Sequence, residues 1–271
     1  MRPIRTVAVF PTMFTLGNLV CGFFALVVAA RVAAPDPQAM DPTDPTNVML
    51  SGWLIFLAMI FDALDGYVAR LSRTASDFGA ELDSLCDLVT FGVAPAFLLV
   101  KMCPDFALVH KEEVWIIAAS FAACAALRLA RFNVETSDED DHLTFSGLPA
   151  PAAAAAIAGF AIMFYTLRKE DTPLLYAAEI DTVLQTILPF FAVLLSLLMV
   201  SRIPYPHVVN QLFRGQRSFG HVVAVLFALV AVMVIRGYSV PIICCGFALF
   251  GPIRFVWEKV VERRHREEPI F

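Results

Sequence analysis

Four aspartates stand at regular spacing in the most informative segment of this 271-residue chain. Asp62 and Asp65 are three residues apart, so they share one face of a helix. Asp83 and Asp87 are four residues apart and share a face of the next helix. Both helices lie in apolar runs, where a charged residue costs about 2.5–3.5 kcal/mol at the centre of a membrane span. Carboxylates kept at that cost usually bind ions, pair with cations or take part in chemistry.

The two helices that carry these aspartates are predicted to form an antiparallel hairpin with its turn near Thr74. Asp62 and Asp87 are then about equally far from the turn. The same holds for Asp65 and Asp83. If the helices pack side by side, the four carboxylates meet at one depth, towards the inner leaflet. Carboxylates this close repel one another unless a cation intervenes.

The residue types favour a hard divalent cation that handles phosphate. Oxygen ligands suit Mg²⁺ or Mn²⁺, with Ca²⁺ also compatible, rather than zinc. Mg²⁺ binds through a few carboxylates together with substrate phosphates, and two ions could bridge a pyrophosphate. Gly66 and Gly79 lack side chains on the same faces, which leaves room for a ligand beside the backbone. Arg70 offers a cation for phosphate.

Two other interpretations compete with catalysis. Asp65 or Asp83 could form only an ion pair with Arg70 or Arg73, although this suits one isolated acid better than four. A cation transporter could also line its path with acids. A transporter does not require glycine and arginine at these positions, and no paired broken helices of the transporter type are visible.

Residues 62–87 resemble the complete signature of the CDP-alcohol phosphotransferase family, D-x-x-D-G-x-x-A-R-x8-G-x3-D-x3-D. Members of that family are membrane enzymes that displace CMP from a CDP-linked donor with an alcohol. The resemblance implies that Asp62, Asp65 and Asp83 are the main metal ligands. It implies that Asp87 is the general base and also touches the second metal. Contacts to the CDP-linked lipid are implied for Gly66, Ala69, Arg70, Ser76 and Gly79.

Further strings resemble the bacterial-type phosphatidylserine synthase subfamily. They lie at 10–18, 78–85, 127–133 and 145–151, so the resemblance covers much of residues 10–155. In the first string, Thr15 and Asn18 are expected to contact the CDP-linked lipid, whereas Thr12 stands where many members have asparagine. The subfamily implies CDP-diacylglycerol and L-serine as substrates. Glycerol phosphate, inositol phosphate or another alcohol as acceptor, and an archaeal ether-lipid donor, stay open as alternatives.

Arg128 and Arg131 lie at the expected inner end of a predicted span. One of them could hold an anion in the site, either the serine carboxylate or a donor phosphate. The alternative is that they anchor the helix by the positive-inside rule or extend to the lipid head groups.

The helices that position these residues are predicted to be membrane spans. The chain is 59% hydrophobic and only 17% charged, against about 25% charged residues in soluble domains. We therefore expect an all-α integral membrane protein in contact with membrane lipid, and no basic stripe suggests nucleic acid. Eight apolar windows are long enough to span, namely 7–30, 50–72, 83–102, 113–132, 149–167, 182–201, 219–236 and 239–259.

The distribution of Lys and Arg predicts the orientation. With the N-terminus inside, fourteen basic residues fall on the inner side and six on the outer side. Both termini and the active site are then expected to face the cytoplasm from the cell membrane. We expect one membrane domain over 1–271, with catalytic helices in 1–167 and additional helices in 168–271. A homodimer is compatible with this organisation.

Overall fold

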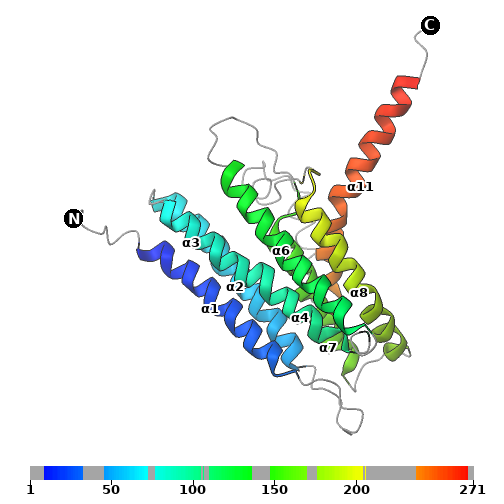
Figure 1. The fold of residues 1–271 in the computed structure, drawn as a ribbon, viewed down its shortest axis with the longest axis horizontal. Helices are drawn as coiled ribbons and strands as arrows, with labels where there is room; N and C mark the ends of the chain where they lie inside the picture. The colour runs from blue at the N-terminus through cyan, green and yellow to red at the C-terminus, as the bar shows by residue number, and fades with distance from the viewer. Residues whose placement is uncertain are drawn as a thin grey trace.

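The chain folds as a bundle of long helices (Figure 1). Six helices are long and apolar enough to cross a membrane. No strand occurs among the residues that the structure describes. The composition therefore predicted the class correctly, and the protein is an all-helical, multi-pass membrane protein. The structure is a computed structural model that describes residues 9–32, 46–72, 77–104, 106, 110–135, 147–169, 176–203, 205 and 236–267.

The six candidate spans coincide with the first six predicted windows, with ends that differ by a few residues. The third span begins at Phe78 instead of residue 83, because the helix starts before its apolar part. This span is built from three consecutive elements, with a π-helical turn in the middle. The elements of the six spans are α1 (Val9–Ala30), α2 (Thr46–Ser72), α3 (Asp77–Asp87), η2 (Leu88–Val93), α4 (Ala94–Met102), α6 (Lys111–Glu135), α7 (Ala150–Arg168) and α8 (Ala177–Val200).

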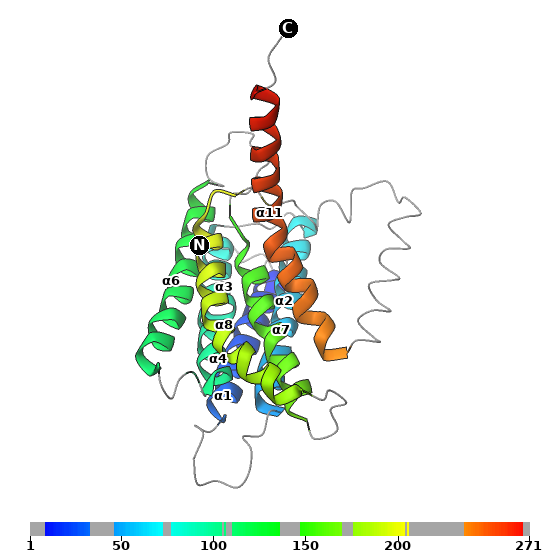
Figure 2. The same cartoon turned by 90° about the vertical axis from the view of Figure 1, so that its right-hand side faces the viewer.

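The last two predicted spans are not among these six. The window 219–236 lies outside the described residues, except for Arg236, which begins the short 3₁₀ helix η3 (Arg236–Tyr238). The window 239–259 forms the first part of α11 (Ser239–Glu267), whose apolar stretch is shorter than the six candidate spans. The C-terminal half of α11 projects beyond the bundle (Figure 2). Eight spans therefore remain a prediction.

Helix α7 lies at the centre of the bundle, although it is rich in alanine. It packs against α2, α8 and α11, and it is the most buried of the six candidate spans. Small residues let membrane helices approach closely. A Cβ atom on Gly52 of α2 would lie only 2.9 Å from the Ala158 carbonyl oxygen of α7. The small side chains of this span thus suit contact with other helices rather than with lipid.

A polar cluster ties three helices together at the end of the bundle opposite to the aspartates. Arg168 at the end of α7 donates from Nε to Asp181 Oδ1 of α8 at 2.9 Å. Gln185 donates to Asp181 Oδ2 at 2.7 Å, and Arg168 also donates to the Met102 carbonyl oxygen at 3.3 Å. This cluster fixes the ends of α4, α7 and α8 relative to one another.

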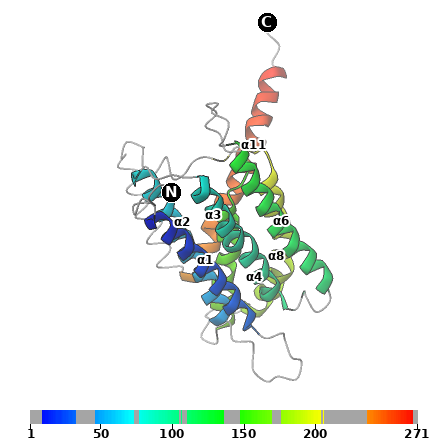
Figure 3. The same cartoon turned by 60° about the vertical axis from the view of Figure 1, so that its left-hand side comes forward.

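Helix α1 lies beside both helices that carry the aspartates (Figure 3). It packs along α2 and against α3, η2 and α4, whereas α2 and α3 barely touch each other in their described residues. The two spans that carry the aspartates do pack against each other, but through α4 and η2 rather than through α3. At the level of the aspartates, α1 packs against both α2 and α3. The expected turn near Thr74 lies outside the described residues.

Candidate metal and substrate site

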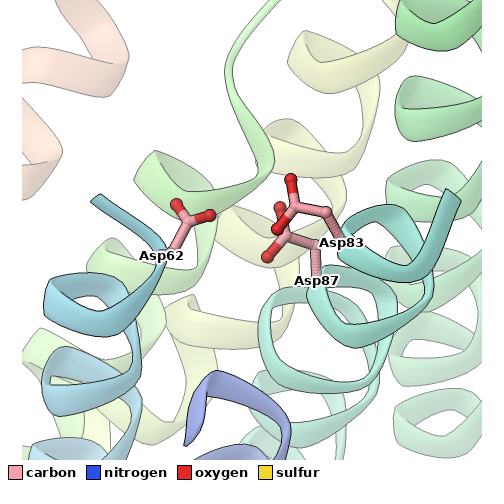
Figure 4. Close-up of side chains that lie close together, drawn as sticks. All are labelled: Asp62, Asp83 and Asp87. Atoms are coloured by element: carbon pink, nitrogen blue, oxygen red, sulfur yellow. The ribbon is translucent and has the colours of Figure 1, made fainter. Parts of the chain in front are cut away.

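Three of the four aspartates face one another across the gap between α2 and α3. Asp62 projects from α2 towards Asp83 and Asp87 on α3 (Figure 4). One carboxylate oxygen from each residue lies within 4.8 Å of the other two. Asp87 is buried, whereas Asp62 and Asp83 are half-buried. Asp62 belongs to a different helix from Asp83 and Asp87. The structure thus brings together residues that are distant in the sequence, as their spacing predicted.

The fourth carboxylate belongs to the same cluster but turns towards α1. Asp65 is buried and interacts electrostatically with Asp62, Asp83 and Asp87. Its Oδ2 atom accepts a hydrogen bond from the hydroxyl of Thr15 on α1. Asp65 therefore lies at the edge of the cluster, and its carboxylate is hydrogen-bonded to Thr15 of α1.

Helix α1 also holds the last aspartate of the signature. Asn18 donates from Nδ2 to Asp87 Oδ1 at 2.8 Å, and the asparagine side chain is completely buried. Thr15 and Asn18 are three residues apart, so one face of α1 presents both to the site. Sequence reasoning expected these residues to contact the CDP-linked lipid. The structure shows each of them bonded to a carboxylate.

The cluster suits a hard divalent cation. The donors are carboxylate oxygens from two helices, the ligand type that Mg²⁺ and Mn²⁺ prefer. Asp83 Oδ1 is buried and has no hydrogen-bond partner among the described residues. A buried oxygen of this kind is costly unless something satisfies it. A bound cation would satisfy this atom and offset the repulsion between the carboxylates.

Several predicted contact residues can be placed only in part. Gly66 is exposed on α2 and Gly79 is half-buried on α3, on the two helices that carry the cluster. The side chains of Ala69 and Arg70 lie outside the described part of the chain, and so does the whole of Ser76. The alternative ion pairs of the aspartates with Arg70 or Arg73 are therefore not tested.

The two arginines of α6 occupy different surroundings. Arg128 is buried, with its guanidinium carbon 5.6 Å from the ring centroid of Phe132. Arg131 donates to the Val200 carbonyl oxygen at the end of α8, at 3.4 Å. Because Val200 ends α8, the contact of Arg131 places this part of α6 at the end of the bundle where the aspartates lie.

Sequence reasoning missed a polar link between α3 and α6. Ser84, next to Asp83, donates to Asn133 Oδ1 at 3.1 Å, and Asn133 Nδ2 lies 2.9 Å from the Ser84 hydroxyl. Both residues stand in strings that resembled the synthase subfamily. The strings alone did not show that the two side chains meet, because nothing in the spacing places α6 beside α3.

Comparisons with known proteins identify the family of the chain. A model of the CDP-alcohol phosphatidyltransferase family matches residues 8–250. A CDP-diacylglycerol–serine O-phosphatidyltransferase of Methanocaldococcus jannaschii is 38% identical over 203 residues, which are 75% of this chain and 83% of that protein. A protein of the same name from Bacillus subtilis is 34% identical over 198 residues, 73% of this chain and 89% of its own length. An archaetidylserine synthase of Methanothermobacter thermautotrophicus is 35% identical over 158 residues, 57% of each chain.

The family match covers both halves of the aspartate signature and all six candidate spans. Three of the four carboxylates that the signature contains converge in the structure, at a place with the ligand chemistry of a divalent cation. The chain belongs to the CDP-alcohol phosphatidyltransferase family.

Proposed function

We propose that this protein is a phosphatidylserine synthase, which transfers the phosphatidyl group of CDP-diacylglycerol to the hydroxyl of L-serine and releases CMP. The observation that carries the proposal is the meeting of Asp62, Asp83 and Asp87 within 4.8 Å. Relatives that are 38% and 34% identical to this chain, over 203 and 198 residues, are named as serine phosphatidyltransferases. The archaetidylserine synthase relative supports an ether-lipid donor as the alternative to CDP-diacylglycerol.

In the proposed reaction, the serine oxygen attacks the lipid-linked phosphorus in line with the bond to CMP. A new bond forms between the serine oxygen and phosphorus, and the bond from that phosphorus to the CMP oxygen breaks. Asp87 takes the proton of the serine hydroxyl as the new bond forms. Its position at the buried end of the cluster supports this role, because it lies beside Asp83 and Asp62 yet is held by Asn18.

The remaining carboxylates are proposed as metal ligands. Asp62, Asp65 and Asp83 would hold divalent ions together with Asp87, and the family is generally dependent on such ions. We propose two ions, Mg²⁺ or Mn²⁺. When bound, they would offset the negative charge of the pyrophosphate and of the departing CMP. The half-buried Asp62 and Asp83 leave their carboxylates accessible to a donor that enters between the helices.

Other residues are proposed to bind the substrates. Gly66 and Gly79 leave space beside the backbone for the CDP part. The CDP contacts of Ala69, Arg70 and Ser76, and a contact of Thr15 or Asn18 with the lipid, stay predictions. Arg128 or Arg131 would hold the serine carboxylate or a donor phosphate, which is supported by the place of Arg131 on α6 beside the end of α8.

The proposed topology places the aspartates near the cytoplasmic face of the cell membrane. It is supported by the excess of Lys and Arg on the side of the chain that carries the site. In this arrangement both termini are cytoplasmic, eight spans form one membrane domain, and 1–167 holds the catalytic helices. The lipid tails of the donor would stay in the bilayer, while the nucleotide part and serine approach from the cytoplasm. A homodimer is compatible with this topology.

The acceptor distinguishes this proposal from its alternatives. Purified protein in detergent, with CDP-diacylglycerol and Mn²⁺, is expected to release CMP when L-serine is added. Glycerol 3-phosphate and inositol phosphate are not expected to support release. The ether-linked donor is compared in the same assay, and Asp62→Ala serves as the inactive control. Turnover with glycerol 3-phosphate and none with serine would make the acceptor assignment wrong. No CMP release with any acceptor would favour a transporter.

A further inference from the structure

Asn18 joins the first helix of the bundle to the proposed general base. Its Nδ2 atom lies 2.8 Å from Asp87 Oδ1, and both side chains are buried. An ionised carboxylate only accepts hydrogen bonds, so the amide nitrogen must be the atom that faces it. The asparagine therefore fixes one oxygen of Asp87 and sets the direction of the other.

Asn18 is itself held from the other side. Its backbone carbonyl accepts a hydrogen bond from the Thr90 hydroxyl at 3.3 Å, three residues after Asp87. Thr90 lies in the π-helical turn Leu88–Val93, which begins directly after Asp87 and precedes Pro95. Proline has no amide hydrogen and cannot continue the ordinary helical ladder. Turns of this kind inside α-helices are rare and often occur at functional sites.

The close approach of α1 to this turn depends on Gly22. A Cβ atom at Gly22 would lie 2.9 Å from the Thr90 Cα atom, which real side chains do not tolerate. Gly22 is one turn after Asn18 on the same face of α1. Asn18 thus lies one helical turn from this close contact, and its backbone carbonyl is bonded to the same threonine, so it has little freedom to move away from Asp87.

The amide oxygen of Asn18 shows that packing does not explain this residue. Asn18 Oδ1 is buried and has no hydrogen-bond partner among the described residues. A leucine would fill the same space without the cost of a buried, unsatisfied oxygen. The polar group that this side chain uses is therefore its amide N–H, which donates to Asp87.

We infer that Asn18 is a positioning residue, which orients the Asp87 carboxylate so that its second oxygen faces the serine hydroxyl. The inference rests on the proposed function, because it assigns Asn18 an effect on the step in which Asp87 takes the proton. It differs from the expected contact of Asn18 with the CDP-linked lipid. A lipid contact would act on donor binding, whereas a positioning residue acts on the chemical step.

The first test replaces Asn18 with leucine, which has a similar size and no donor. Single-turnover CMP release with serine is expected to fall roughly 10–100-fold, because a misplaced catalytic group costs rate rather than affinity. The KM for CDP-diacylglycerol and the affinity for Mn²⁺, measured by electron paramagnetic resonance, are expected to stay within about 3-fold of wild type. A loss confined to the donor KM would contradict the inference and identify Asn18 as a lipid contact.

Ser51→Ala is the matched control for packing between helices. The Ser51 hydroxyl of α2 donates to the Ala25 carbonyl oxygen of α1 at 2.9 Å, and Ser51 is completely buried. This variant removes a buried polar contact of α1 without touching the aspartates, so its turnover is expected to stay near that of wild type. Equal losses of rate in Ser51→Ala and Asn18→Leu would show a general packing effect and overturn the inference.

A double-mutant cycle decides whether Asn18 acts through Asp87. In an Asp87→Asn background, Asn18→Leu is expected to cause little further loss, because the group that it orients has lost its function. Additive losses would contradict the inference. If Asn18→Leu does not insert, Thr90→Val tests the same geometry from the π-helical turn η2, with a smaller fall expected in the same step. Unchanged single-turnover release in Thr90→Val would then overturn the inference.

A measurement on the wild-type protein distinguishes a failure of this inference from a failure of the proposed function. Serine-dependent CMP release by the same preparation is measured first. If another acceptor supports release in its place, the serine assignment fails, and the Asn18 variants are compared with that acceptor. The positioning role of Asn18 is then judged by the same split between single-turnover rate and Mn²⁺ affinity.

Discussion

Single-turnover CMP release by an Asp87→Asn variant is expected to be slower than that of wild type by about 10²–10⁴-fold, the loss typical of a missing general base. Asparagine has almost the same size as aspartate, so the helix and its contact with α1 should persist. Donor affinity is expected to fall much less than in Asp62→Ala or Asp65→Ala, which remove principal metal ligands. Donor binding and CMP release are measured on the same preparation.

Serine methyl ester provides a control for this prediction. Its hydroxyl still has to lose a proton, so the ester should not rescue Asp87→Asn. Two results would show that Asp87 is not the base. One is a wild-type single-turnover rate. The other is a loss of donor binding as complete as that of Asp62→Ala.

Removal of divalent ions is expected to lower CMP release by about 10³-fold or more, because the carboxylates alone repel the pyrophosphate. Asp62→Ala and Asp83→Ala should lose activity to the same extent while the protein still inserts into membranes. Mn²⁺ binding followed by electron paramagnetic resonance should weaken in both variants. This readout is independent of turnover and tests the ligand assignment directly.

Glu81→Gln is the matched control for the metal ligands. Glu81 is an exposed carboxylate on α3, two residues before Asp83, and does not belong to the cluster. Its replacement should leave Mn²⁺ binding and CMP release near wild type. Full activity in excess chelator, or unchanged Mn²⁺ affinity in Asp62→Ala, would show that the metal assignment is wrong.

The sequence predicted which carboxylates meet better than it predicted how the helices pack. The convergence of Asp62, Asp83 and Asp87 followed from helical spacing and from the cost of charge in a span. The packing of α1 against both α2 and α3 did not follow, because the spacing does not show which helix packs against which. The contact of Asn18 with Asp87 depends on α1, which hydrophobicity alone could place beside any other helix.

Helix α7 and the π-helical turn illustrate the same limit. The window 149–167 is rich in alanine, yet α7 lies at the centre of the bundle and is the most buried of the six candidate spans. Small side chains weaken the hydrophobic signal and at the same time allow close helix packing. Pro95 signals an interrupted ladder of hydrogen bonds, but only the structure shows that the interruption is a π-helical turn beside Asp87.

The central claim is that the serine oxygen becomes bonded to the lipid phosphorus while CMP leaves. L-serine labelled with ¹⁸O in its hydroxyl, CDP-diacylglycerol and Mn²⁺ are incubated with purified protein, and both products are analysed by mass spectrometry. The account predicts that phosphatidylserine carries the label and that CMP carries none. Unlabelled phosphatidylserine, label in CMP, or CMP release without a serine-containing lipid would contradict it.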